Sequence, residues 1–188
     1  MLTLVKHGSP EWKEARKCMI TASLAAACLG LHPWISRQKA WRLIMGLEEM
    51  AVNPNMQWGL ENEKRARADY EAETGQLVQT VAGFWVHDTF PWLGASPDCL
   101  ISTDGMAEFK CPEKLPEAMP PHYEIQVRIQ LACTGRAWCD FYSWTPEGHF
   151  KERIERMMPD ESILIKQLTT FHSLYILGNT QPPRKKRT

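Results

Sequence analysis

The chain has 188 residues, with 22 acidic and 22 basic side chains and a pI near 7.0. This length predicts a single domain over residues 1–180 followed by a basic, flexible tail over 181–188. The balanced charge excludes a protein coated in positive charge, although local basic patches still permit binding to nucleic acid. No apolar run is long enough to span a bilayer, so we expect no membrane contact.

The cysteines and the first residues favour a cytoplasmic protein. Six cysteines are scattered along the chain, and none forms a Cys-x-x-Cys pair that would indicate a zinc site. The chain does not begin with the pattern of a signal peptide. Reduced thiols in the cytoplasm are the simplest interpretation.

The first part of the chain predicts helices. Ser9, Pro10 and Glu11 are typical of a helix start, and the helical pattern extends to Cys18. Further helices are expected over 24–29, 36–45 and 56–74, each followed by a glycine that is suited to ending a helix.

The second part predicts strands over 77–81, 83–87, 92–95, 99–102 and 106–110, then a helix over 122–133. Two strands over 137–145 and 149–154 and a helix over 160–177 follow. This order indicates an α/β domain in which a mixed central β-sheet is flanked by helices. The basic tail is either an electrostatic arm for DNA or a solvated terminus.

The most informative motif joins Asp98 to the triplet Glu108-Phe109-Lys110, in a PD-(x)-ExK arrangement. Alternate side chains of a strand share a face, so Glu108 and Lys110 point the same way and Phe109 points to the other face. A turn at Gly105 makes the preceding strand a hairpin partner, which brings Asp98 to the same point.

Carboxylate oxygens at that point suit Mg²⁺ or Mn²⁺. A metal held there polarises a phosphodiester and lowers the pKa of a bound water, and Lys110 positions or deprotonates that water. The chemistry predicted is phosphodiester hydrolysis. The alternative is a chance match among common surface residues.

Four residues elsewhere are candidates for the same site. Arg16 and Ser23 flank a predicted helix start and form a potential phosphate pocket, unless Ser23 only caps the helix and Arg16 pairs with an acid. Glu63, on the face of Gly59, either helps to hold a metal through water or faces solvent. Gln126, one turn from Gln130, either orients the attacking water or belongs to a half-buried polar stripe.

Met56 precedes the Trp58-Gly59 pair and is expected near the catalytic helix. Apolar side chains can unstack base steps, so Met56 is a candidate wedge for separating strands. The alternative is an ordinary buried residue at the start of the helix.

With these motifs in hand, the chain resembles the lambda exonuclease (YqaJ-type) family of viral recombinases, within the PD-(D/E)xK nucleases. The match is collinear from Ser9 to Trp144. It comprises W-x(3)-R-x(3)-I-T-A-S, W-G-x(3)-E, S-P-D, E-x-K-C-P and Q-V-x(2)-Q-L, which begin at positions 12, 58, 96, 108 and 126.

The resemblance implies a restriction-endonuclease-like core and digestion of double-stranded DNA from 5′ ends with two Mg²⁺ ions, for which Mn²⁺ substitutes. It also implies a ring-shaped homotrimer, a single-strand annealing protein as partner, and the cytoplasm of a bacterial host for a phage protein. A neutral chain attracts DNA only weakly at long range, and a ring that encircles the duplex would keep the protein bound in spite of this.

The resemblance also assigns roles residue by residue. Asp98 and Glu108 look like metal ligands, helped by the carbonyl of Phe109, and Lys110 looks like the catalytic lysine. Other positions that match the family by motif are the helix acid Glu63, the active-site glutamine Gln126, and the 5′-phosphate pocket of Arg16, Ser23 and Ser96. Asp88 lies ten residues before Asp98, where the family also has an acid. The chain departs from the family after Pro112, where it lacks a nearby arginine, and Lys114 is the candidate substitute.

We therefore predict a Mg²⁺-dependent 5′→3′ exonuclease that digests one strand of duplex DNA and leaves a 3′ single-stranded overhang for recombination. One alternative is a structure-specific or restriction-type endonuclease on the same core. Another is a non-catalytic module that binds DNA ends.

Overall fold

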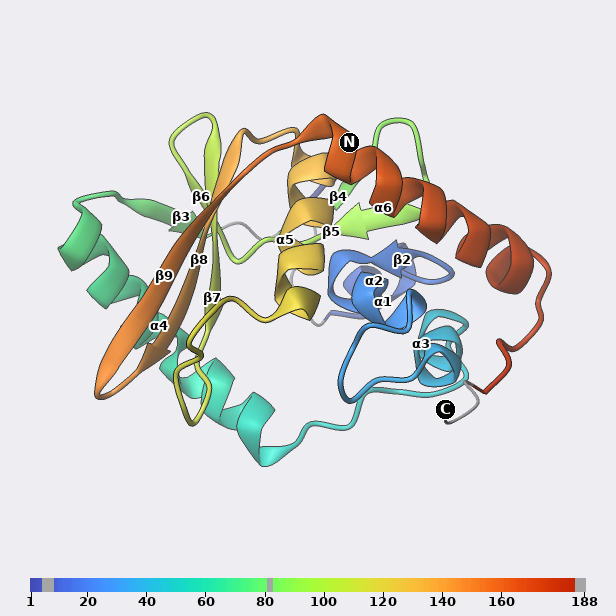
Figure 1. Ribbon diagram of the computed structural model, residues 1–188, viewed down its shortest axis with the longest axis horizontal. Coiled ribbons are helices and arrows are strands. Elements are labelled where there is room, and N and C mark those ends of the chain that lie inside the picture. Colours follow the sequence, from blue (N-terminus) through green and yellow to red (C-terminus); the bar gives the residue numbers. More distant parts are fainter. Residues whose placement is uncertain (5–8, 81–82, 185–188) are drawn as a thin grey trace.

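The computed structural model describes residues 1–4, 9–80 and 83–184. The architecture is mixed α/β with sheets flanked by helices, as predicted (Figure 1). In chain order the elements are β1 (Leu2–Thr3), α1 (Pro10–Ala15), β2 (Ile20–Thr21), α2 (Ala22–Cys28), α3 (Arg37–Ile44), α4 (Pro54–Thr74), β3 (Val78–Thr80), β4 (Phe84–Val86), β5 (Leu93–Ala95), β6 (Cys99–Ile101), β7 (Gly105–Lys110), α5 (Pro121–Thr134), β8 (Trp138–Thr145), β9 (Gly148–Glu155), α6 (Met158–Phe171) and the π-helical segment η1 (His172–Leu177).

The strands form two sheets rather than the one central sheet predicted. The larger sheet has the order β3-β6-β7-β8-β9, in which β7 and β8 run parallel and the other neighbours antiparallel. The smaller sheet has the order β1-β4-β5-β2, with β2 and β5 parallel. The strands β1 and β2 contain two residues each, too few to show an alternating pattern in the sequence.

Helix α5 lies between the two sheets, and α4 covers the opposite face of the larger sheet (Figure 1). Helix α2 packs against β2 and β5 of the smaller sheet, and α3 and α6 pack against α2. The larger sheet therefore has an apolar cluster on each face, one beneath α4 and one beneath α5.

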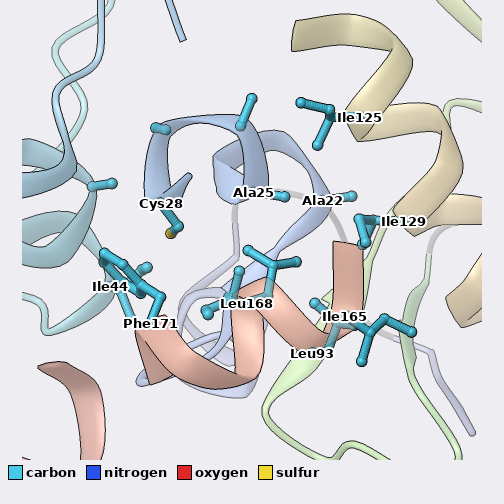
Figure 2. Packing of buried hydrophobic residues seen from close by; sticks show 14 of the residues in the cluster. Ala22, Ala25, Cys28, Ile44, Leu93, Ile125, Ile129, Ile165, Leu168 and Phe171 are labelled. Atoms are coloured by element: carbon cyan, nitrogen blue, oxygen red, sulfur yellow. The ribbon is translucent and has the colours of Figure 1, made fainter. Parts of the chain in front are cut away.

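A third apolar cluster joins α2, α3, α5, α6 and β5 (Figure 2). Helix α2 contributes small side chains, among them Ala22 and Ala25, which allow α5 to approach with Ile125 and Ile129. Full burial of a side chain such as Ile129 contributes about 1.5–3 kcal/mol. This packing fixes the position of α5, which carries part of the candidate site.

Several helix boundaries differ from the predicted ones. The last helix is α-helical to Phe171 and then continues as a π-helical turn, where one uninterrupted helix was expected. Thr21 occupies the N-cap of α2 and Ser23 lies in the first turn, so the alternative in which Ser23 only caps this helix is wrong. Within the described part of the chain, no helix is long and apolar enough to cross a membrane.

Candidate active site

Strand β7 orients Glu108 and Lys110 toward α5, as its alternating pattern predicts. Phe109 points to the other face, where it packs against Tyr70 of α4 and Tyr142 of β8. The polar members of the motif therefore face one helix, and the apolar residue between them anchors the strand from the opposite side.

Glu108 is the centre of the cluster and is only 1% exposed. Its Oε1 accepts hydrogen bonds from Lys110 Nζ and Gln126 Nε2, both at 2.5 Å. Its Oε2 accepts one from Gln130 Nε2 at 2.7 Å. A buried carboxylate requires such compensation, and the strand and α5 together supply it.

Asp98 lies immediately before β6, close to Glu108. Its Oδ2 accepts a hydrogen bond from the backbone N–H of Phe109 at 2.8 Å, which ties the two parts of the motif together. Burial, followed by the charge of Glu108, raises the pKa of Asp98 well above its usual range, and Glu63 adds to this effect. Buried carboxylates that repel each other are stabilised in their ionised forms by the positive charge of a nearby cation.

Lys110 supplies part of that charge. Burial alone would lower the pKa of its ammonium group, but the carboxylates of Glu108 and Asp98 raise it overall. The ammonium also lies 5.0 Å from the ring centroid of Tyr123, the third residue of α5. Lys110 is thus a cation held against a carboxylate, with its free donors available to a further ligand.

Glu63 and Gln126 approach the cluster from the two helices. Glu63, on α4, pairs with Arg67 one turn later, and its charge raises the pKa of Asp98. Gln126 and Gln130 lie one turn apart on α5 and both donate to Glu108. The sequence places Gln130 on the same helix face as Gln126, one turn away. Its hydrogen bond to Glu108 was not predicted, and this helical spacing was the only signal for it.

A second set of polar groups surrounds the ends of β2 and β5. These strands are parallel, with Thr21 opposite Gly94, so Ser23 and Ser96 follow at the same edge. The hydroxyl of Ser96 is buried and has no hydrogen-bond partner among the described residues, and the hydroxyl of Ser23 lies 3.1 Å from that of Thr21.

Arg16 lies near the same strands. Its guanidinium stacks on Trp12 at 3.7 Å and lies 5.9 Å from Phe84, whose ring packs against Gly94. Burial lowers the pKa of Arg16 to about 10. Its Nε is buried without a partner, and among the described residues no carboxylate forms an ion pair with it. A partly buried cation that no described carboxylate neutralises is suited to an anion.

A family model for the YqaJ-like viral recombinase domain matches residues 11–137. The chain belongs to this family. The predicted resemblance is therefore confirmed, and it spans the whole of the cluster around Glu108 and the polar groups near Arg16. A comparison with curated proteins found no match.

Solved structures agree with this assignment. An alkaline exonuclease, LHK-Exo from Laribacter hongkongensis, is 33% identical, with 91% of this chain and 96% of that chain covered and a TM-score of 0.75. The same exonuclease in complex with dAMP is 32% identical, with the same coverage and a TM-score of 0.76. A phage-related exonuclease from Haemophilus somnus 129PT shares the fold at 12% identity, with 88% of this chain and 96% of that chain covered and a TM-score of 0.66.

Three residues predicted for the site lie outside the cluster. Asp88 is on the surface with its side chain 91% exposed, and its carboxylate pairs with the amino group of Met1 at 2.9 Å. Lys114 is exposed on the segment between β7 and α5. Met56 lies in the first turn of α4 and is 39% exposed, so it is not the buried residue of the alternative interpretation.

The donors of the cluster fit Mg²⁺, which is bound in proteins by one or two carboxylates together with water and substrate phosphates. Within the described residues, no three acidic, histidine or cysteine side chains form a ready-made metal cage. Asp98 and Glu108 nevertheless offer two carboxylates, and Oε1 of Gln130 is buried without a partner. Hard oxygen donors that are incompletely satisfied are suited to a hydrated divalent cation.

Proposed function

We propose that this protein is a Mg²⁺-dependent 5′→3′ exonuclease that digests one strand of double-stranded DNA from its end. The observation that carries the proposal is the buried carboxylate of Glu108, held between Lys110 and Gln126 and beside the destabilised carboxylate of Asp98. Such an arrangement costs folding free energy and is typical of catalytic sites.

The comparisons support the general activity. The chain belongs to a viral recombinase family, and it is one-third identical to an alkaline exonuclease over nearly all of both chains. A DNA exonuclease is the function that this family membership and the buried cluster support together. The metal, the polarity and the product are our more specific proposals.

Each side chain of the cluster has a chemical role in this proposal. Asp98 and Glu108, with the carbonyl of Phe109, would hold the metal, and Glu63 would assist from α4. The metal would supply charge stabilisation at the phosphodiester and a water of lowered pKa. Lys110, as a cation, would donate a hydrogen bond to that water or to a phosphate oxygen, and Gln126 would orient the water.

The polar groups near Arg16 support attack from a 5′ end. A terminal phosphate carries more negative charge than an internal phosphodiester, and a partly buried guanidinium such as that of Arg16 can recognise it with two donors. The unpartnered hydroxyl of Ser96 and the hydroxyl of Ser23, at the same sheet edge, would add hydrogen bonds. Lys114, on its exposed segment, would contact the backbone further along the strand.

The proposal extends to the assembly. Exposed apolar side chains occur close together in one stretch of the chain, namely Leu47, Met50, Val52, Trp58 and Leu60. Apolar surface of this kind favours a subunit contact, and we propose a homotrimer that encloses the DNA. The 3′ overhang it leaves would be passed to a single-strand annealing protein during phage-type recombination.

The direct test uses linear duplex DNA labelled at either the 5′ or the 3′ end, with Mg²⁺ or with EDTA. We expect early release of the 5′ label in Mg²⁺ only, and no cleavage of closed circular duplex. Cleavage of the circle would indicate an endonuclease and overturn the proposal. A second test compares digestion rates on duplexes with a 5′-phosphate and with a 5′-hydroxyl. We expect wild type to prefer the 5′-phosphate and Arg16→Ala to lose that preference. The absence of a preference in wild type would refute the phosphate pocket.

A further inference from the structure

Trp34 lies in the segment between α2 and α3 and is 74% exposed. Its backbone is held in place by His32, whose Nδ1 accepts hydrogen bonds from the N–H groups of Trp34 at 3.2 Å and Ile35 at 3.1 Å. The indole is therefore a large aromatic surface presented to solvent on a braced turn.

Two histidines support the edge of this indole. The ring centroid of Trp34 lies 5.7 Å from that of His32 and 5.5 Å from that of His122, and the two imidazoles are 5.0 Å apart. His122 is in the first turn of α5 and is 8% exposed. Its Nε2 is buried and finds no hydrogen-bond partner in the part of the chain that the structure describes. The group combines an exposed aromatic face with an unsatisfied buried nitrogen.

The same group is continuous with the candidate active site. The ring of His122 lies 4.1 Å from that of Tyr123, and Tyr123 lies 5.0 Å from Lys110 Nζ. One turn further along α5, Gln126 donates to Glu108. An unbroken series of side-chain contacts thus leads from the exposed indole to the catalytic lysine.

An exposed tryptophan by itself is unremarkable, since apolar atoms form much of any protein surface. Trp34 differs because two histidine rings support it and because it adjoins a site that we propose for DNA hydrolysis. Aromatic side chains beside a nucleic-acid channel bind bases by stacking, which tolerates any sequence. A non-specific exonuclease requires that tolerance.

We propose that Trp34 is a stacking platform for a nucleobase of the strand being digested, and that it places the adjoining phosphodiester over Glu108 and Lys110. This inference rests on the proposed function and names a positioning residue for it. His32 and His122 hold the indole in place for this contact.

The test compares wild type, Trp34→Ala and Trp34→Phe on linear duplexes whose first 5′ nucleotides either carry bases or are abasic. Leu31→Ala, an exposed apolar change in the same segment, is the matched control. Loss of one stacked base is expected to slow wild type about 5- to 150-fold, equivalent to about 1–3 kcal/mol. Trp34→Ala should show the same loss on the normal duplex and little further loss on the abasic one, while Trp34→Phe should retain part of the rate.

Equal slowing of Trp34→Ala on both substrates would overturn the proposal. A change in the mass of the assembled protein, measured for this variant by light scattering, would also overturn it, because Trp34 would then lie in a subunit contact. If wild type hydrolyses no duplex at all, the proposed function has failed, and stacking is then judged by binding alone. Fluorescence anisotropy with end-labelled duplex, without divalent ions, should show weaker binding by Trp34→Ala to normal ends and unchanged binding to abasic ends. Unchanged binding to both would refute the platform.

Discussion

Replacing Lys110 by methionine removes the charge of the proposed catalytic lysine while keeping most of its alkyl stem. The stem is largely buried, with the side chain 24% exposed, so methionine preserves the packing beside Tyr123 better than alanine does. Cleavage should fall about 10²–10⁴-fold, which corresponds to about 3–5 kcal/mol of barrier, because a positioned proton-transfer group is lost. Binding of duplex ends should remain.

The same change has a predictable effect on stability. Removing one partner of a buried ion pair typically costs about 3–5 kcal/mol, because the other charge is left without compensation. Glu108 keeps its hydrogen bonds from Gln126 and Gln130, so we expect a loss of about 1–3 kcal/mol instead. Chemical denaturation followed by tryptophan fluorescence measures this loss.

The matched control for Lys110→Met is Lys151→Met. Lys151 on β9 also pairs with a glutamate, Glu73, at 3.0 Å, but on a more exposed surface. This change should cost at most about 1 kcal/mol and leave cleavage unaffected. Lys110→Met protein that is folded and cleaves duplex DNA in Mg²⁺ at a rate close to wild type would refute the assignment of Lys110.

Three further outcomes are expected. Asp98→Asn should abolish cleavage yet raise the thermal midpoint of the metal-free protein by about 2–4 °C, because it removes a charge that its neighbours repel; a lowered midpoint would contradict this. Met56→Ala should slow digestion of a blunt duplex more than that of a frayed end, and equal slowing would reject the wedge. Burial, with His32 and Lys110, lowers the pKa of His122 to about 4, below its ordinary 6.5. As the pH falls from 6.5 to 4, His122 takes up a proton in the unfolded chain but not in the folded protein, which should destabilise the fold by up to about 3 kcal/mol. Chemical denaturation measured across this pH range should show a smaller loss of stability for His122→Gln.

The part of the site that the sequence predicts best is the part governed by local periodicity. Alternation along β7 placed Glu108 and Lys110 on one face and Phe109 on the other, and helical spacing placed Gln126 and Gln130 together. The structure agrees on both points, because each relation depends on a single element.

Relations between distant elements were less accessible from the sequence. The short strands β1 and β2 have no periodicity of their own and exist because β4 and β5 accept them as partners. Asp88 looked like a site acid by its position in the chain, but its carboxylate pairs with the amino group of Met1, a contact with no local signal. The contact of Trp34 with His122 likewise joins two segments that lie far apart in the sequence.

Helix α5 presents a different neighbour on each of its faces. Ile125 and Ile129 pack into the cluster of α2 and α6, Val127 and Leu131 pack against the larger sheet, and Gln126 and Gln130 hold Glu108. A rotation of this helix that relieves strain on one face must misalign the other two. Engineering for heat resistance should therefore leave the contact between α2 and α5 unchanged. Larger side chains there would raise the melting temperature only by shifting α5, and that shift would lower the activity. Substitutions at exposed positions of α6, such as Ile163, offer a safer route to a more durable enzyme.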